Sequence, residues 1–173
     1  MEDKLILVNE KDEVVGVDEK LKVHREGLLH RAFSVFVLNS HGELLMQRRA
    51  LTKYHSPGLW SNTCCGHPRP SEHVTLAAQR RLRAEMGLAC PLRRVGSFRY
   101  RADVGDGLLE HEFDHLLVGH SNIEPVLNIE EAIDWKWVRF ETLIRELSDD
   151  PKNFTSWLGI IMDTQAHKLG VAL

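Results

Sequence analysis

The stretch from Ser61 to His67, with the sequence SNTCCGH, places the Cys65 thiol and the His67 imidazole two residues apart. Side chains two apart on a strand point to the same face, and a helix is expected to start directly after this stretch. A thiol beside an imidazole can transfer protons or bind a metal ion. Cysteine is also among the residues most often buried without a chemical role, so the neighbouring sequence must distinguish the two interpretations.

A second group of candidates lies on a predicted strand from Leu108 to Val118. It carries Glu110, Glu112 and Asp114 at a period of two, which places three carboxylates on one face of the strand. Like charges at this spacing repel, so the face is stable only if a cation binds, a carboxyl takes up a proton, or solvent screens the charges. A bound cation and a solvated edge strand both satisfy this condition.

Among the ten histidines, His24 and His30 follow Lys20 closely in the sequence. The segment between the two histidines has no clear hydrophobic period and is predicted to be a loop or short turn. Two loop histidines six residues apart can be metal ligands or ordinary exposed side chains.

Basic side chains gather where a predicted strand from Glu43 to Arg49 ends. Arg48 and Arg49 close this strand, and Lys53 follows shortly after it. The cluster can bind an anion locally, or it can be an ordinary solvated strand end.

Composition limits the class of protein that carries these groups. The 173 residues are 43% hydrophobic, which suits one domain with a single buried core over residues 1–173. The 22 basic and 25 acidic residues leave a net charge of −3, so no general attraction to nucleic acid or to a membrane is expected.

The same sequence predicts a cytoplasmic location. Apolar runs stay well short of the ~20 residues of a membrane span, and the segment Met1 to Lys4 lacks the features of a signal peptide. The three cysteines, two of them adjacent, suit reduced thiols better than a disulfide framework.

The elements that must position the candidate groups follow from hydrophobic period and turn residues. The helix is clearest from Ser71, the expected N-cap, to Gly87, the expected stop. The other predicted elements are a hairpin within 5–17, strands 31–38, 43–49, 95–101, 108–118 and 133–138, and helices 140–147 and 154–168. Trp157 falls in the first turns of the last helix.

The region of the first predicted helix also carries a spaced motif that resembles the Nudix box, a loop-helix-loop that binds diphosphates through metal ions. The matching positions are Gly66, Glu72, Arg80, Leu82, Glu85, Gly87 and Leu88. Nudix hydrolases have glutamates at the positions of Arg81 and Ala84. Loss of two carboxylates should disable the metal cluster that activates water, so the scaffold is expected to serve another reaction.

The chain from about Ile6 to Trp157 resembles the type I isopentenyl-diphosphate isomerase family. The motifs that carry this likeness are His30 with Ala32-Phe33-Ser34, Arg48-Arg49-Ala50-Leu51, Trp60 to Pro68, Arg80 to Gly87, Phe98-Arg99-Tyr100-Arg101 and Glu110-His111-Glu112. The resemblance implies an α/β (α+β) fold, with a Nudix-like mixed β-sheet flanked by helices in a single compact domain. It also implies reversible isomerisation of isopentenyl to dimethylallyl diphosphate in isoprenoid biosynthesis, through a carbocation and with the diphosphate kept intact.

The resemblance assigns roles to four residues. Cys65 and Glu112 match the two groups that transfer protons on opposite faces of the substrate. Tyr100 matches a tyrosine that hydrogen-bonds near this carboxylate, and Trp157 matches an indole that stabilises the cation and helps close the pocket. Cys64 is expected to be buried packing.

The resemblance further implies a metal site and a diphosphate site. The metal ligands would be His24, His30, His67, Glu110 and Glu112. Zinc or manganese suits these ligand types, and magnesium is a further option. A second ion, Mg²⁺, would bridge the diphosphate with help from Glu85.

The diphosphate would be gripped by four cations. These are Lys20, Arg49, Lys53 and Arg81. They give the local basic cluster a use despite the net negative charge. Arg81 would replace a carboxylate of the hydrolases with a cation that binds substrate.

Two other functions compete with isomerisation. A Nudix hydrolase would share the fold and the diphosphate but would release phosphate. In a metal-stabilised binding module the His and Glu ligands would be structural, and Cys65, Tyr100 and Trp157 would have no functional role. The expected partner is a small allylic or homoallylic diphosphate, and the chain is expected to be a monomer or weak homodimer.

Overall fold

The computed structural model describes residues 3–170, and its centre is a mixed sheet of nine strands. The strands are β1 (Lys4–Val8), β2 (Val14–Glu19), β3 (His30–Leu38), β4 (Leu44–Arg49), β5 (Trp60–Ser61), β6 (Cys64–Gly66), β7 (Leu92–Gly105), β8 (Leu108–His120) and β9 (Ala132–Val138). The helices are α1 (Lys20–Glu26), α2 (Val74–Met86), α3 (Phe140–Asp149) and α4 (Ser156–Gln165), with short 3-10 turns at Pro151–Asn153 and Ala166–Leu169. The predicted fold class, a mixed sheet flanked by helices, is confirmed.

Strand β3 organises the sheet, because its apolar run is buried almost throughout. It pairs in parallel with β8, which places His30 opposite Glu112, and antiparallel with β6, which places Ser34 opposite Cys65. Strand β7 pairs with the other edge of β8 and places Tyr100 opposite Glu112. Register alone therefore places Cys65 on one side of β3 and Glu112, with Tyr100 opposite it, on the other side.

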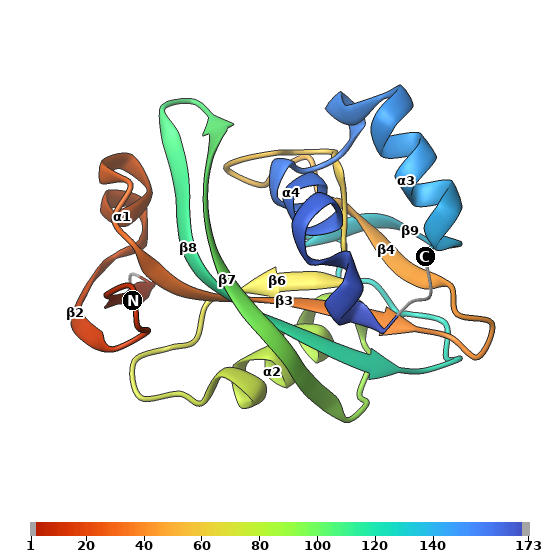
Figure 1. Ribbon diagram of the computed structural model, residues 1–173, viewed down its shortest axis with the longest axis horizontal. Coiled ribbons are helices and arrows are strands. Elements are labelled where there is room, and N and C mark those ends of the chain that lie inside the picture. Colours follow the sequence, from red (N-terminus) through yellow and green to blue (C-terminus); the bar gives the residue numbers. More distant parts are fainter. Residues whose placement is uncertain (1–2, 171–173) are drawn as a thin grey trace.

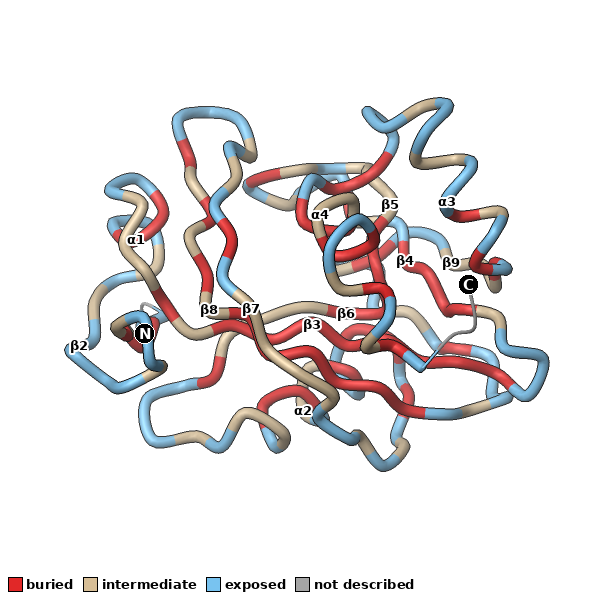
Figure 2. Tube along the Cα trace, viewed as in Figure 1, coloured by how far each residue is buried: buried red, intermediate tan, exposed pale blue. Residues whose placement is uncertain are grey.

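Helices cover both faces of the sheet, as Figure 1 shows with α2 on one side and α3 and α4 on the other. One core packs the apolar faces of α3 and α4, including Leu143 and Ile161, against the sheet. The second core packs Ala77, Ala78 and Leu82 of α2 against the opposite face. Buried residues follow β3 and the second half of β8, whereas the turns are exposed (Figure 2).

Helix α2 is shorter than its sequence suggests. It begins at Val74, and His73 caps it by accepting a hydrogen bond from the Thr75 backbone N–H. Ser71 has a φ of 67°, outside the helical region, and the prediction that Ser71 is the N-cap is therefore wrong. The expectation of a helix directly after His67 is also wrong, although the predicted stop at Gly87 is confirmed by its left-handed φ of 64°.

The predicted loop between His24 and His30 is wrong as well. His24 lies on the seven-residue helix α1, which ends at Gly27 with a φ of 63°, and His30 is the first residue of β3. A helix of two turns shows too few apolar repeats for its period to be recognised.

The C-terminal helices lie close to their predicted positions. Helix α3 extends to Asp149, and α4 starts at Ser156 and gives way to a 3-10 turn after Gln165. Within residues 3–170, no helix combines the length and the apolar character needed to cross a membrane. Met1 and Glu2 of the segment assessed for a signal peptide lie outside the described residues.

Candidate active site and metal cluster

A cavity of about 1060 Å³ collects side chains from both halves of the chain. Residues of the catalytic and diphosphate-binding predictions that line it are Lys20, Arg49, Lys53, Cys65, Arg81, Tyr100, Glu112 and Trp157. His67, Glu85 and Glu110 of the predicted metal ligands line it too, whereas His24 and His30 are fully buried behind it. The structure thus gathers the predicted site residues around one cavity.

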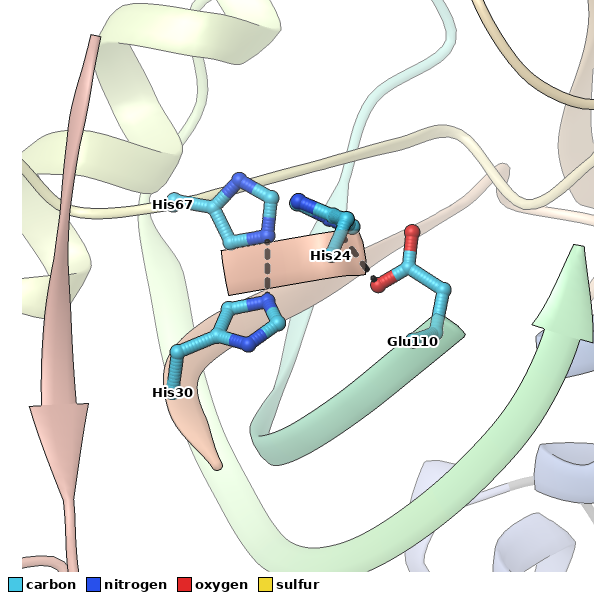
Figure 3. Close-up of side chains that lie close together, drawn as sticks. All are labelled: His24, His30, His67 and Glu110. Carbon is cyan, nitrogen blue, oxygen red and sulfur yellow. Dashed lines mark hydrogen bonds and ion pairs between the residues drawn. The ribbon is translucent and has the colours of Figure 1, made fainter. Parts of the chain in front are cut away.

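Three histidines and one carboxylate converge beside this cavity (Figure 3). One ligand atom each from His24, His30, His67 and Glu110 lies within 4.8 Å of every other. The Nδ1 atoms of His24 and His30 face the backbone carbonyls of Lys20 at 2.7 Å and Leu28 at 2.9 Å. When a ring donates from Nδ1 and carries no proton on Nε2, its Nε2 lone pair is directed at the cluster, which is the arrangement that binds a metal.

Unpaired atoms in this cluster also fit a divalent ion. His24 Nε2 and Glu110 Oε2 are buried without a hydrogen-bond partner in the described part of the chain, and they lie 3.6 Å apart. His30 Nε2 and His67 Nε2 face each other at 3.2 Å. Buried acceptors left unpaired are costly unless something electropositive lies between them. The cluster can therefore hold a divalent metal ion.

Glu112 lies at the edge of the cluster. Its Oε1 is 3.0 Å from His67 Nε2 and 3.6 Å from His30 Nε2, while its Oε2 accepts a 2.7 Å hydrogen bond from Tyr100 Oη. Strand β8 lies between β3 and β7, so the alternative of a solvated edge strand is wrong. The face that carries Glu110, Glu112 and Asp114 is buried.

The repulsion among these carboxylates is relieved by unequal protonation. Burial works against ionisation of Glu112, but its contacts with Glu110 and His30 hold its pKa at about 2. Burial, followed by the charge of Glu112, raises the pKa of Asp114 well above its usual value. Asp114 therefore stays protonated beside an ionised Glu112. Burial and the neighbouring His30 hold the pKa of His67 well below its usual value.

Asn62 connects the candidate thiol with the indole. Its Oδ1 accepts hydrogen bonds from Cys65 Sγ at 3.2 Å and from Trp157 Nε1 at 3.2 Å. Its amide nitrogen donates to two backbone carbonyls, which holds the side chain in place. Burial, and then the proximity of Asp114, raises the pKa of Cys65 to about 12, so this residue is a neutral thiol near pH 7.

Carboxylates already contact the basic cluster. Arg81 Nη2 lies 2.6 Å from Glu85 Oε1 and 3.0 Å from Glu131 Oε1, and Lys53 Nζ lies 2.6 Å from Glu131 Oε2. Arg49 lies 5.2 Å from the centre of the Trp157 ring. Burial, together with the charge of Lys53, lowers the pKa of Lys20. The cations thus surround one region of the cavity, where an anion can compete with Glu131.

Several residues at the site were absent from the sequence prediction. They are His55, Asn62 and Glu131. His55 and Glu131 lie in irregular segments, and the hydrophobic period of the sequence does not indicate that these segments pass over the cavity. The position of Asn62 inside the SNTCCGH stretch was the one available signal for its role. Cys64 is fully buried against α2, as predicted.

Comparison with known proteins gives two consistent results. Residues 28–158 match the NUDIX domain family. A protein of Aromatoleum aromaticum named Isopentenyl-diphosphate Delta-isomerase 2 is 52% identical over 94% of this chain and 86% of its own length. An Isopentenyl-diphosphate Delta-isomerase of Serratia proteamaculans is 48% identical over 98% of this chain and 95% of its own length.

Solved structures agree on the fold. A crystal structure of a Deinococcus radiodurans protein superposes with a TM-score of 0.79 and 23% identity, over 93% of this chain and 98% of the other. A MutT protein from Methanosarcina mazei superposes with a TM-score of 0.67 and 16% identity, over 83% and 96% of the two chains. At these identities the likeness concerns the fold alone.

Proposed function

The chain belongs to the isopentenyl-diphosphate Delta-isomerase family and carries a NUDIX domain, and we propose that it interconverts isopentenyl and dimethylallyl diphosphate by proton transfer between Cys65 and Glu112. The observation that carries this mechanism is the shared cavity. Cys65 and Glu112 line it from different strands, and each is held by its own hydrogen bond.

The reaction needs one proton donor and one proton acceptor. One group adds a proton to the terminal alkene carbon, which leaves a tertiary cation, and the other removes a proton from the carbon on the far side of that centre. Cys65 and Glu112 perform these two steps and exchange roles when the reaction reverses. Without a bound metal ion, the pKa of the Cys65 thiol is about 12 and that of Glu112 is about 2, so the thiol carries a proton to donate and the carboxylate can accept one.

Trp157 and Tyr100 assist these steps. The buried indole of Trp157 lines the cavity and can stabilise the cation by its π face, an interaction worth up to ~2 kcal/mol when desolvated. It also helps to exclude water, which would otherwise capture the cation. Tyr100 holds Glu112 through the 2.7 Å hydrogen bond and assists protonation.

Metal ligands of the proposed site are His24, His30, His67, Glu110 and Glu112. Zinc or manganese suits this set of three imidazoles and two carboxylates, and magnesium is a further option. A divalent ion held by these residues would supply a positive charge that orients Glu112 and tunes its acidity.

The diphosphate is proposed to bind among Lys20, Arg49, Lys53 and Arg81. Support comes from their position around one cavity, where Arg81 and Lys53 pair with Glu131, a carboxylate that an incoming anion can replace. Glu85 would help to hold a second ion, Mg²⁺, at the diphosphate. Arg81 and Ala84 stand where Nudix hydrolases have carboxylates, which argues against water activation.

The test is to mix purified protein with isopentenyl diphosphate and Mg²⁺ in deuterated water and to follow proton and phosphorus NMR together. Growth of dimethylallyl signals with deuterium incorporation and an intact diphosphate is expected. Free phosphate would support the hydrolase instead. An unchanged spectrum from protein supplied with Zn²⁺, Mn²⁺ and Mg²⁺ would leave the binding module.

A further inference from the structure

His55 lies between the metal cluster and the indole, and no motif of the sequence draws attention to it. It follows β4 in an irregular segment, yet it is only 6% exposed and lines the cavity. Its Nε2 is 3.2 Å from Glu110 Oε1. Its ring meets the Trp157 ring edge-on, with centroids 5.7 Å apart and planes at 83°.

The contact with His55 gives the two carboxylate oxygens of Glu110 different surroundings. Oε1 faces His55, whereas Oε2 is buried without a partner 3.6 Å from His24 Nε2. When His55 donates its Nε2–H to Oε1, the other oxygen is left to point at the metal cluster. Hydrogen bonds of this kind orient metal ligands and typically change metal affinity by 10- to 100-fold.

The surroundings of His55 support this donor state. Its Nδ1 is 3.5 Å from Ser56 Oγ, a hydroxyl that can donate to an unprotonated ring nitrogen. The Tyr54 ring packs edge-on against the imidazole at 4.4 Å. The backbone carbonyl of His55 also accepts a 3.0 Å hydrogen bond from Arg49 Nη2. This bond holds the backbone segment that carries the ring.

We propose that His55 is a positioning residue that presents Glu110 Oε2 to the metal ion and sets the distance between the metal cluster and Trp157. This inference rests on the proposed metal site. His55 acts through the Nε2–H bond to Glu110 and through the edge contact with the indole, and it does not touch the ion itself.

Two variants separate these contacts. His55→Phe keeps an aromatic edge against Trp157 but removes the donor, and His55→Gln keeps an N–H donor without the ring. Each is titrated with Co²⁺ and followed by visible absorption, with thermal melting of the metal-free protein as the folding control. We expect His55→Phe to weaken Co²⁺ binding by at least about 10-fold and His55→Gln to restore it to within about 3-fold of the unmodified chain.

Each other outcome has a defined meaning. Unmodified protein that binds no Co²⁺ would overturn the metal site and this inference together. Normal binding by His55→Phe, beside normal binding by the unmodified chain, would overturn the inference alone. Equal loss in both variants would make His55 a direct ligand and would also overturn it.

A measurement on the unmodified chain tests the inference even if His55→Phe does not fold. Nitrogen NMR of the imidazole distinguishes a ring protonated at Nε2 from one protonated at Nδ1. The Nε2–H tautomer is expected in the metal-loaded protein. The Nδ1–H tautomer would leave Glu110 Oε1 without its donor and would overturn the inference.

Discussion

The hydroxyl of Tyr100 donates a 2.7 Å hydrogen bond to Oε2 of Glu112, and the two residues lie directly opposite each other on β7 and β8. The other oxygen of the same carboxylate faces His67 at 3.0 Å. One carboxylate therefore has a phenol on one side and the metal cluster on the other. Both contacts restrict its rotation, so Glu112 meets the cavity in a single orientation.

Replacement of Tyr100 by phenylalanine removes this bond while keeping the ring. Hydrogen bonds to charged groups contribute about 1.5–3 kcal/mol, so kcat should fall about 10- to 100-fold. KM should change little, because the Tyr100 hydroxyl is bonded to Glu112, whereas the diphosphate is proposed to bind among other side chains. Steady-state kinetics measure both, and an unchanged kcat would rule out a role for the hydroxyl.

The adjacent cysteines provide a matched pair of variants. Cys65→Ala should lower isomerisation by about 10³-fold, since it removes one of the two proton-transfer groups. Binding of inorganic pyrophosphate should persist, because the cations are unchanged. Cys64→Ala shortens a side chain buried against α2 and should cost about 1 kcal/mol of unfolding free energy, with activity retained. Equal activity of both variants would exclude Cys65 from the reaction.

Alkaline pH should destabilise the metal-free protein through Cys65. Burial raises its pKa from 9.0 to about 12, so above pH 9 the unfolded chain loses the thiol proton while the folded chain keeps it. Stability from this group is fully present below pH 9 and is lost as the pH rises towards 12, by up to about 1.4 kcal/mol per pH unit. Urea unfolding at several pH values should show a shallower decline for Cys65→Ser. Parallel curves for the two proteins would contradict the expectation.

Removal of the metal should lower thermal stability. An ion that binds only the folded chain adds about 2.7 kcal/mol when present at 100 times its Kd. A chelated sample should therefore melt earlier than one supplied with Zn²⁺ or Mn²⁺, and His24→Ala should abolish this difference. His41→Ala, in an exposed turn, serves as the control and should retain it. A metal-dependent shift that survives in His24→Ala would place the ion elsewhere.

Loss of the charge on Glu131 should strengthen binding of diphosphate. Glu131 pairs with both Lys53 and Arg81, so an incoming anion must compete with it. Glu131→Gln should tighten inorganic pyrophosphate binding by about fivefold, equivalent to ~1 kcal/mol. The exposed neighbour Glu130 supplies the control variant Glu130→Gln, which should bind as the unmodified chain does. Calorimetry distinguishes the two, and weaker binding by Glu131→Gln would mean that the carboxylate supports the site.

Much of the local structure was predictable because it depends on neighbours in the sequence. The apolar run of β3, the N-terminal hairpin and the stop of α2 at Gly87 all follow from period and turn chemistry. The start of α2 was not predictable, because the left-handed backbone at Ser71 shifts the cap to His73. The short helix that carries His24 was missed because seven residues show too little period.

By itself the sequence determined which chemical groups the chain possesses and which faces of its strands they occupy. Motif spacing singled out the thiol, the carboxylates and the basic cluster. The tertiary structure alone decided that β8 is an inner strand, because strand order depends on pairings between segments about 80 residues apart, such as Ser34 Oγ with Asp114 Oδ2. Because β8 is buried, the pKa of Glu112 is lowered while that of Asp114 is raised. The fold of the chain also brings His55 and Glu131 from irregular segments to the cavity. Such long-range contacts leave no local period in the sequence, since they are set by packing of the whole core.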